Sequence, residues 1–157
     1  MSKSQLNGDT PMGAVKQFAK HSLRVVVSAV TILFAGHSGL VLSDAVKVTL
    51  SGDQEIPPVT TTASGTGTIT VAADKSVSGN ATISGLSVTV AHIHEAAAGR
   101  NGPIVFPLIK TSDNVWSVPA GTKLTDAQYE SYKAGNLYFN IHSATYKAGE
   151  VRGQIKP

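Results

Sequence analysis

Short runs of alternating residues begin at residue 46, and they constrain the fold more than any other feature of this chain. Between Gly65 and Ala72, threonines alternate with Gly67, Ile69 and Val71. A two-residue period places one set of side chains on each face of a β-strand. Similar runs rich in Val, Thr, Ile and Ser recur between turn residues. The pattern favours an all-β sandwich or barrel.

The turn signals divide this region into strands and one short helix. Ala73-Asp74-Lys75 predicts the turn of a hairpin. A helix is predicted near 125–134, because Thr125 can cap it, Gln128 completes a capping box and Gly135 suits the position after its end. The predicted strands are 46–50, 65–72, 76–84, 86–94, 103–109, 115–118, 136–142 and 150–155.

The first 45 residues have a different character and predict a secretory signal peptide. Lys16, Lys20 and Arg24 precede an uncharged apolar stretch of 11 residues, Val25 to Ala35. That length suits a signal core and is short for a membrane span of roughly 20 residues. Small residues place the predicted cleavage site near Ala45. The alternative is an anchor that is never cut.

Cleavage would leave one domain, residues 46–157, exported to the periplasm or the extracellular space and free of the membrane. Met1 and Met12 are both possible starts, since a signal beginning at Met12 has a more ordinary basic region. The chain has no cysteine, which excludes disulfides and a lipoprotein anchor. Nine Lys and Arg nearly balance eight Asp and Glu from residue 46 onward, so no nucleic-acid partner is indicated.

Three histidines remain in the predicted domain, and all lie in strand-like segments. His92 and His94 occur in the sequence HIHE, and His142 lies on a later strand. Residues i and i+2 of a strand share a face, so the first two rings stand roughly 6.5–7 Å apart. If the two strands are neighbours or face each other, the three imidazoles form a metal site with an open position. The alternative is that they are ordinary surface or core residues.

Four polar residues are candidates for the surroundings of such a metal: Glu95, Tyr138, Asn140 and Arg152. Glu95 can orient a ligating histidine, or simply end the strand in solvent. Arg152 can steer an anion toward a metal, or pair with Glu150 or Glu55. No nucleophile motif supports a hydrolase.

Three stretches resemble the CHRD domain, which is repeated in chordin and found singly in many exported bacterial proteins. They are QEIPPV at 54–59, the segment from Ala91 to Leu108, and the segment from Leu124 to Ile155, which contains YFNIHS and GEVRGQI. Lys147-Ala148-Gly149 stands where the family often has Pro and Gly, a change that concerns only a turn. The resemblance implies a Greek-key, immunoglobulin-like β-sandwich and carries no enzymatic activity with it. In chordin these domains belong to an extracellular binder of growth factors.

A second, local resemblance concerns the site. HIHE is similar to the HVHE stretch of copper/zinc superoxide dismutases, which are exported β-sandwich proteins. That likeness implies copper ligation by His92, His94 and His142, with Arg152 nearby. The chain departs from that family, because it shows no bridging histidine, zinc loop or disulfide.

The first functional hypothesis is an exported protein that binds a transition metal, copper preferred and zinc the alternative, for metal handling or redox chemistry. An enzyme is not the favoured interpretation. If the protein is one, we expect copper-dependent redox chemistry such as superoxide dismutation. The alternative is a non-enzymatic protein-interaction or structural module with no metal.

Overall fold

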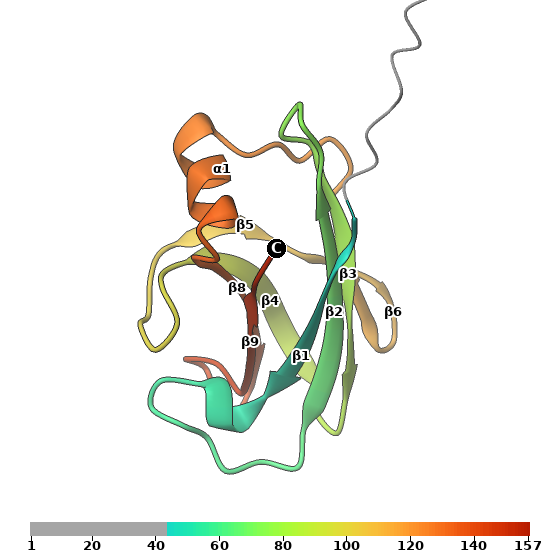
Figure 1. Ribbon diagram of the computed structural model, residues 1–157. Coiled ribbons are helices and arrows are strands. Elements are labelled where there is room, and N and C mark those ends of the chain that lie inside the picture. The colour runs from blue at the N-terminus through green and yellow to red at the C-terminus, as the bar shows by residue number, and fades with distance from the viewer. Residues whose placement is uncertain (1–43) are drawn as a thin grey trace, which may run out of the picture. The chain divides into compact units, whose positions relative to one another are not determined.

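The computed structural model describes residues 44–157, which form nine strands, a 3₁₀ turn and one α-helix (Figure 1). Residues 1–43, with nearly all of the predicted signal segment, lie outside the described residues. In the described part, no helix is long and apolar enough to cross a membrane. The elements are β1 Val46–Ser51, η1 Gly52–Gln54, β2 Ser64–Val71, β3 Val77–Ser84, β4 Val88–Glu95, β5 Ile104–Pro107, β6 Ile109–Ser112, β7 Val115–Ser117, α1 Asp126–Lys133, β8 Leu137–Ser143 and β9 Val151–Ile155.

All described strands join in one antiparallel sheet that folds over on itself. Its order is β5-β4-β8-β9-β1-β2-β3-β7-β6. Only one residue pair, Ser51 with Arg152, links β1 to β9, so the sheet divides there into two layers. Figure 1 shows β4, β8 and β9 on one side of the core, and β2 and β3 on the other. The predicted all-β fold is confirmed.

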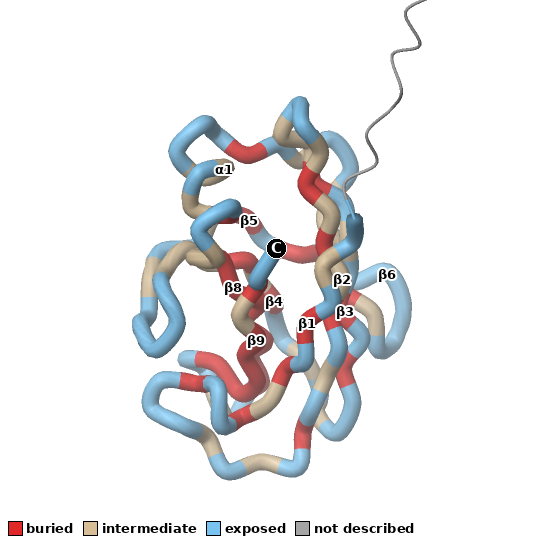
Figure 2. Tube along the Cα trace, viewed as in Figure 1, coloured by how far each residue is buried: buried red, intermediate tan, exposed pale blue. Residues whose placement is uncertain are grey.

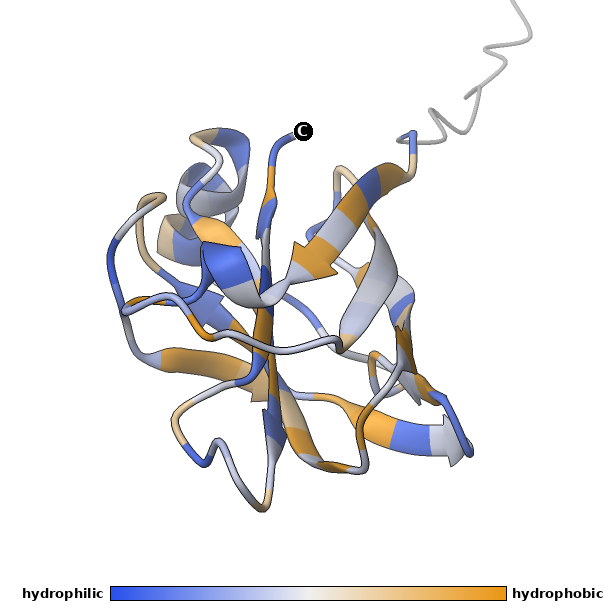
Figure 3. Cartoon of the chain, turned by 90° about the horizontal axis from the view of Figure 1, so that it is seen from below, coloured by the Kyte–Doolittle hydropathy of each residue, from blue (hydrophilic) through white to orange (hydrophobic). Residues whose placement is uncertain are grey.

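The hydrophobic core lies between these layers. Along β1, β2 and β3, buried residues alternate with exposed or half-buried ones, as expected for strands with one face against the core. Figure 3 shows bands of polar and apolar colour along the strands. The fully buried side chains include Leu50, Ile69, Ile83, Ile93 and Phe139. Strand β8 differs from the others because all seven of its residues are buried, so both of its faces are covered (Figure 2).

The predicted turns and helix are confirmed. Strands β2 and β3 pair along their whole length as a hairpin. The hydroxyl of Thr125 accepts from the Gln128 backbone N–H, and the Gln128 side chain accepts from Thr125 N–H, which completes the capping box. Gly135 follows the helix with φ +73°, a conformation that favours glycine.

The single strand predicted at 103–109 is wrong. Two strands, β5 and β6, occupy this stretch and lie at opposite edges of the sheet. The chain changes layers at Leu108, which is buried and whose N–H donates to the carbonyl of Ala91. Pro107 lies at this crossing, and its missing backbone N–H was a local signal for a break that the prediction did not use.

Candidate metal centre

The register of β4, β8 and β9 places all the predicted site residues except Glu95 in rows on one face of the sheet. This is the outer face, opposite the hydrophobic core. One row contains Val90 and His142, the next His92, Asn140 and Arg152, and the third His94, Tyr138 and Gln154. Residues paired directly across antiparallel strands share a face, so strands 50 positions apart bring His142 beside His92.

The three histidines converge on one point. His92 Nδ1 lies 3.1 Å from His142 Nε2. The ring centroid of His92 is 5.5 Å from that of His94 and 5.0 Å from that of His142. One nitrogen from each ring lies within 4.8 Å of the other two, and no carboxylate of residues 44–157 joins this group. The structure therefore brings together all three residues predicted as metal ligands.

Backbone carbonyls orient two of the rings. His94 Nδ1–H donates to the carbonyl of Gly102 at 2.9 Å, and His142 Nδ1–H donates to that of Lys147 at 3.0 Å. A carbonyl only accepts, so these bonds leave Nε2 of both neutral rings as a free lone pair. His94 Nε2 is buried and has no hydrogen-bond partner. Such second contacts on the far nitrogen are typical of metal-ligating histidines.

The distances suit a transition metal after a small closure. Metal–nitrogen bonds are about 2.0–2.1 Å, so the 3.1 Å between His92 Nδ1 and His142 Nε2 corresponds to an angle of roughly 100° at the ion. Two ligands of one ion stand at most about 4.2 Å apart. A pair of ligand atoms separated by the full 4.8 Å must therefore approach by several tenths of an ångström, which a ring rotation provides.

The surroundings favour the neutral form of all three imidazoles, which is the form that ligates a metal. Burial is the largest cause that lowers the pKa of each ring below its usual value. The neighbouring imidazoles lower the pKa of His92 further, and His94 does the same to His142. The carbonyls of Gly102 and Lys147 oppose the shift at His94 and His142, while Arg152 adds to it at His94.

Two of the predicted surrounding residues stack beside the histidines. The ring of Tyr138 lies 5.1 Å from that of His94, at an interplanar angle of 18°. The guanidinium carbon of Arg152 lies 3.5 Å from the centre of the Tyr138 ring. The result is a three-layer stack of guanidinium, phenol and imidazole.

The predicted ion pairs of Arg152 do not form. Its guanidinium donates to Asn101 Oδ1, the carbonyl of Arg100 and Gln154 Oε1, and it makes no ion pair with Glu55 or Glu150. Only 2% of Arg152 is exposed, so its charge is held inside the protein.

Asn140 connects the site to a buried carboxyl group. Its Nδ2 donates to Glu55 Oε1 at 2.6 Å. Burial raises the pKa of Glu55 to about 7, while Arg152 and Asn140 act in the opposite direction. Gly149 packs against both side chains so tightly that an added Cβ would lie 2.6 Å from Asn140 Nδ2 and 2.7 Å from Glu55 Oε1.

The structure does not bring Glu95 to the histidines. Glu95 follows His94 directly, so it points to the opposite face of β4, and it pairs across the ladder with Leu137 of the core face. Its carboxylate accepts a short hydrogen bond from the Ser131 hydroxyl of α1.

The hydrogen bonds from the histidines to the carbonyls of Gly102 and Lys147, and that from Asn140 to Glu55, were not predicted from the sequence. The available signal was Gly102, in the glycine-containing loop between β4 and β5. A Cβ at Gly102 would lie 1.8 Å from the carbonyl oxygen of Glu95, so only glycine fits there.

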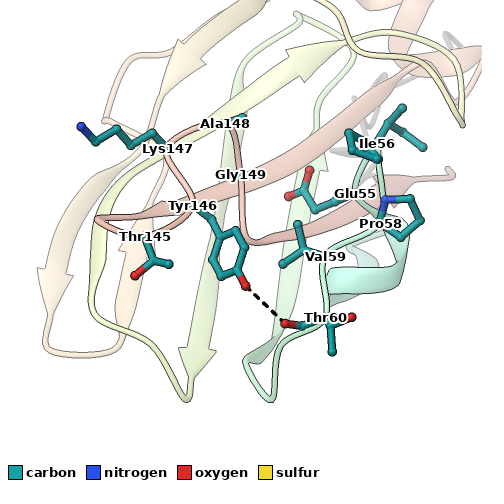
Figure 4. A pocket seen from close by; sticks show the side chains of 11 residues that line it. Glu55, Ile56, Pro58, Val59, Thr60, Thr145, Tyr146, Lys147, Ala148 and Gly149 are labelled. Carbon is teal, nitrogen blue, oxygen red and sulfur yellow. Dashed lines mark hydrogen bonds between the residues drawn. The ribbon is translucent and has the colours of Figure 1, made fainter.

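The turn after β8, whose Lys147 carbonyl accepts the hydrogen bond from His142, also forms one wall of a surface pocket of about 560 Å³ (Figure 4). The segments 55–60 and 145–149 line it, and the Tyr146 hydroxyl donates to the Thr60 carbonyl at 3.4 Å across it. The histidines do not line this pocket. Its relevance to the site is structural, because this contact braces the turn whose Lys147 carbonyl orients His142.

The fold and the site together define an all-β domain with a clustered three-histidine centre on the outer face of one layer. The model of the CHRD domain family matches residues 46–155, and the chain belongs to that family. No curated protein and no solved structure matches the chain.

Proposed function

We propose that this protein is exported and that its CHRD domain binds one transition-metal ion, with copper preferred and zinc the alternative. The ligands would be His92 Nδ1, His94 Nε2 and His142 Nε2. The observation that carries the proposal is the convergence of three neutral imidazoles, two of them oriented by carbonyls, around the unpartnered buried Nε2 of His94.

The hydrogen bonds indicate how metal binding would proceed. His142 Nε2 is an acceptor, so in the metal-free protein the proton between it and His92 belongs to His92 Nδ1. A metal ion would replace this proton, and the His92 ring would then carry its proton on Nε2. Copper is preferred because it binds nitrogen ligands more tightly than other divalent first-row ions.

One feature supports a role in metal handling or redox chemistry, and another supports export. Three protein ligands leave a coordination position open, which is typical of a reactive site, and copper-dependent redox chemistry such as superoxide dismutation would use it. Strand β1 begins at Val46, directly after the expected cleavage site, so removal of residues 1–45 would leave every described strand intact.

Metal content is the direct test. The purified protein is loaded with Cu(II) or Zn(II), freed of excess ion and weighed by native mass spectrometry. We expect one ion per chain, and none in a variant with His92, His94 and His142 all changed to Ala. The control is Lys110→Ala, which changes an exposed residue of β6 at the far edge of the sheet from β4. Equal metal content in the triple variant would overturn the site, and absence of bound metal in wild type would favour the interaction-module hypothesis.

A further inference from the structure

We propose that the three-histidine centre holds copper as Cu(I) in preference to Cu(II), and that the buried guanidinium of Arg152 sets this preference. The inference rests on the proposed function, since it requires that the centre bind copper. It goes further by naming the oxidation state that is bound and the residue that selects it.

The donor set brings no negative charge to the metal. Its three ligands are neutral imidazoles, and within residues 44–157 no carboxylate joins the cluster. The nearby carboxylates have other partners: Glu55 accepts from Asn140, Glu95 from Ser131 and Glu150 from Thr61. The positive charge of a bound ion is therefore not cancelled by its ligands.

A fixed positive charge stands beside this neutral set. Arg152 lies over one face of the Tyr138 ring, and His94 lies against the same ring at 5.1 Å. Three hydrogen bonds to neutral acceptors hold the guanidinium in place.

Coulomb repulsion then distinguishes the two oxidation states. The energy of a pair of charges is proportional to their product, so Arg152 repels a divalent ion twice as strongly as a monovalent one in the same position. Burial of Arg152 limits screening by salt. The difference appears as a higher reduction potential of bound copper, because the oxidised form is the one that is destabilised.

The number of histidine donors also favours Cu(I) over Cu(II). Cu(II) prefers tetragonal coordination with four donors in a plane, whereas the described residues supply three. Cu(I) has a filled d shell and accepts three ligands without this preference.

The test is a pair of affinities. Dissociation constants for Cu(I), measured without oxygen against a coloured Cu(I) chelator, and for Cu(II), measured against a competing amino acid, give the preference as a ratio. We expect tighter binding of Cu(I) by the wild-type protein. In Arg152→Met, which retains an apolar chain over Tyr138, we expect the preference to fall at least tenfold, equivalent to about 59 mV for a one-electron couple.

Two further variants keep the test decisive if Arg152→Met does not fold. Arg152→Lys retains the charge, and we expect its ratio to stay within threefold of wild type. Glu55→Gln, measured at pH 8.5, removes a negative charge that partly offsets Arg152. We expect it to shift the ratio about threefold further toward Cu(I), opposite to the change in Arg152→Met.

The outcomes separate the two proposals. Absence of stoichiometric copper in wild type overturns the proposed function. Copper at one ion per chain with tighter Cu(II) than Cu(I) binding, or with equal losses for both ions in Arg152→Met, overturns the role of Arg152 and leaves the metal site standing. A change of the same sign in Glu55→Gln and Arg152→Met also overturns it.

Discussion

Strands β4, β8 and β9 have two faces of different chemistry, an inner face that is fully buried and an outer face that is only half-buried on β4. The inner face presents Ile93, Leu137, Phe139 and Ile141 to the core, and each is fully buried. The outer face of the same strands presents the histidines, Asn140, Tyr138 and Arg152, covered by loops. Apolar burial stabilises the inner face without direction, whereas every polar atom outside needs a partner. The unpartnered Nε2 of His94 is therefore the exception that points to function.

The largest effect is expected on the inner face. Phe139→Ala should lower the free energy of unfolding by about 3–5 kcal/mol, because it removes a buried ring and leaves a cavity against Gly67. Chemical denaturation measures it. The folded variant should still bind as many metal ions per chain as wild type. A decrease in the free energy of unfolding of less than about 1 kcal/mol would contradict the assigned core.

Copper bound at the outer face should stabilise the folded protein. At a copper concentration 100 times the dissociation constant, the folded state should be stabilised by about 2.7 kcal/mol. Thermal melts with copper, and again after addition of a chelator, measure the gain and its reversal. The variant His92→Ala should show almost no gain. An identical shift in wild type and variant would mean that copper acts elsewhere.

The stability of the protein should depend on pH through Glu55, which contacts Asn140 of the outer face. Burial raises the pKa of this carboxyl to about 7 in the folded protein, above its unfolded value of 4.5. The folded state therefore holds more protons between these values, and the contribution of Glu55 to stability is lost as the pH rises from 4.5 through 7.

Comparison with Glu55→Gln isolates this contribution. The histidines have lowered pKa values, so their contribution has the opposite trend and falls as the pH drops below 6.5. The variant Glu55→Gln keeps the pH dependence due to the histidines and removes the one due to Glu55. The stability of the variant relative to wild type should rise on the order of 2 kcal/mol between pH 4.5 and 8. A constant difference across this range would contradict the raised pKa.

The smallest effect is expected at Glu95. Glu95→Ala removes the hydrogen bond to Ser131 on the inner side of β4 and should cost about 1 kcal/mol of stability. Copper affinity should stay within twofold of wild type, because the carboxylate points away from the histidines. A tenfold loss of affinity, measured by competition, would place Glu95 at the site after all.

Much of the fold and the candidate metal ligands could be predicted from local sequence. Alternation gave the faces of the strands, and Thr125 with Gln128 marked the helix start, because both depend on contacts between near neighbours in the chain. The HIHE spacing put two imidazoles on one face for the same reason. Glu95 was a candidate neighbour of the metal, and a strict two-residue period applied to His94 and Glu95 would have placed their side chains on opposite faces of the strand.

The sequence by itself determined an all-β domain, a two-histidine pair and a single partner for it, His142. Only the tertiary structure decided that β4 and β8 are neighbours in a register that sets His142 at 3.1 Å from His92. It also decided that two loop carbonyls fix the rings and that Arg152 is buried behind Tyr138. These contacts join residues far apart in the chain, and strand pairing and loop closure, rather than local periodicity, bring them together.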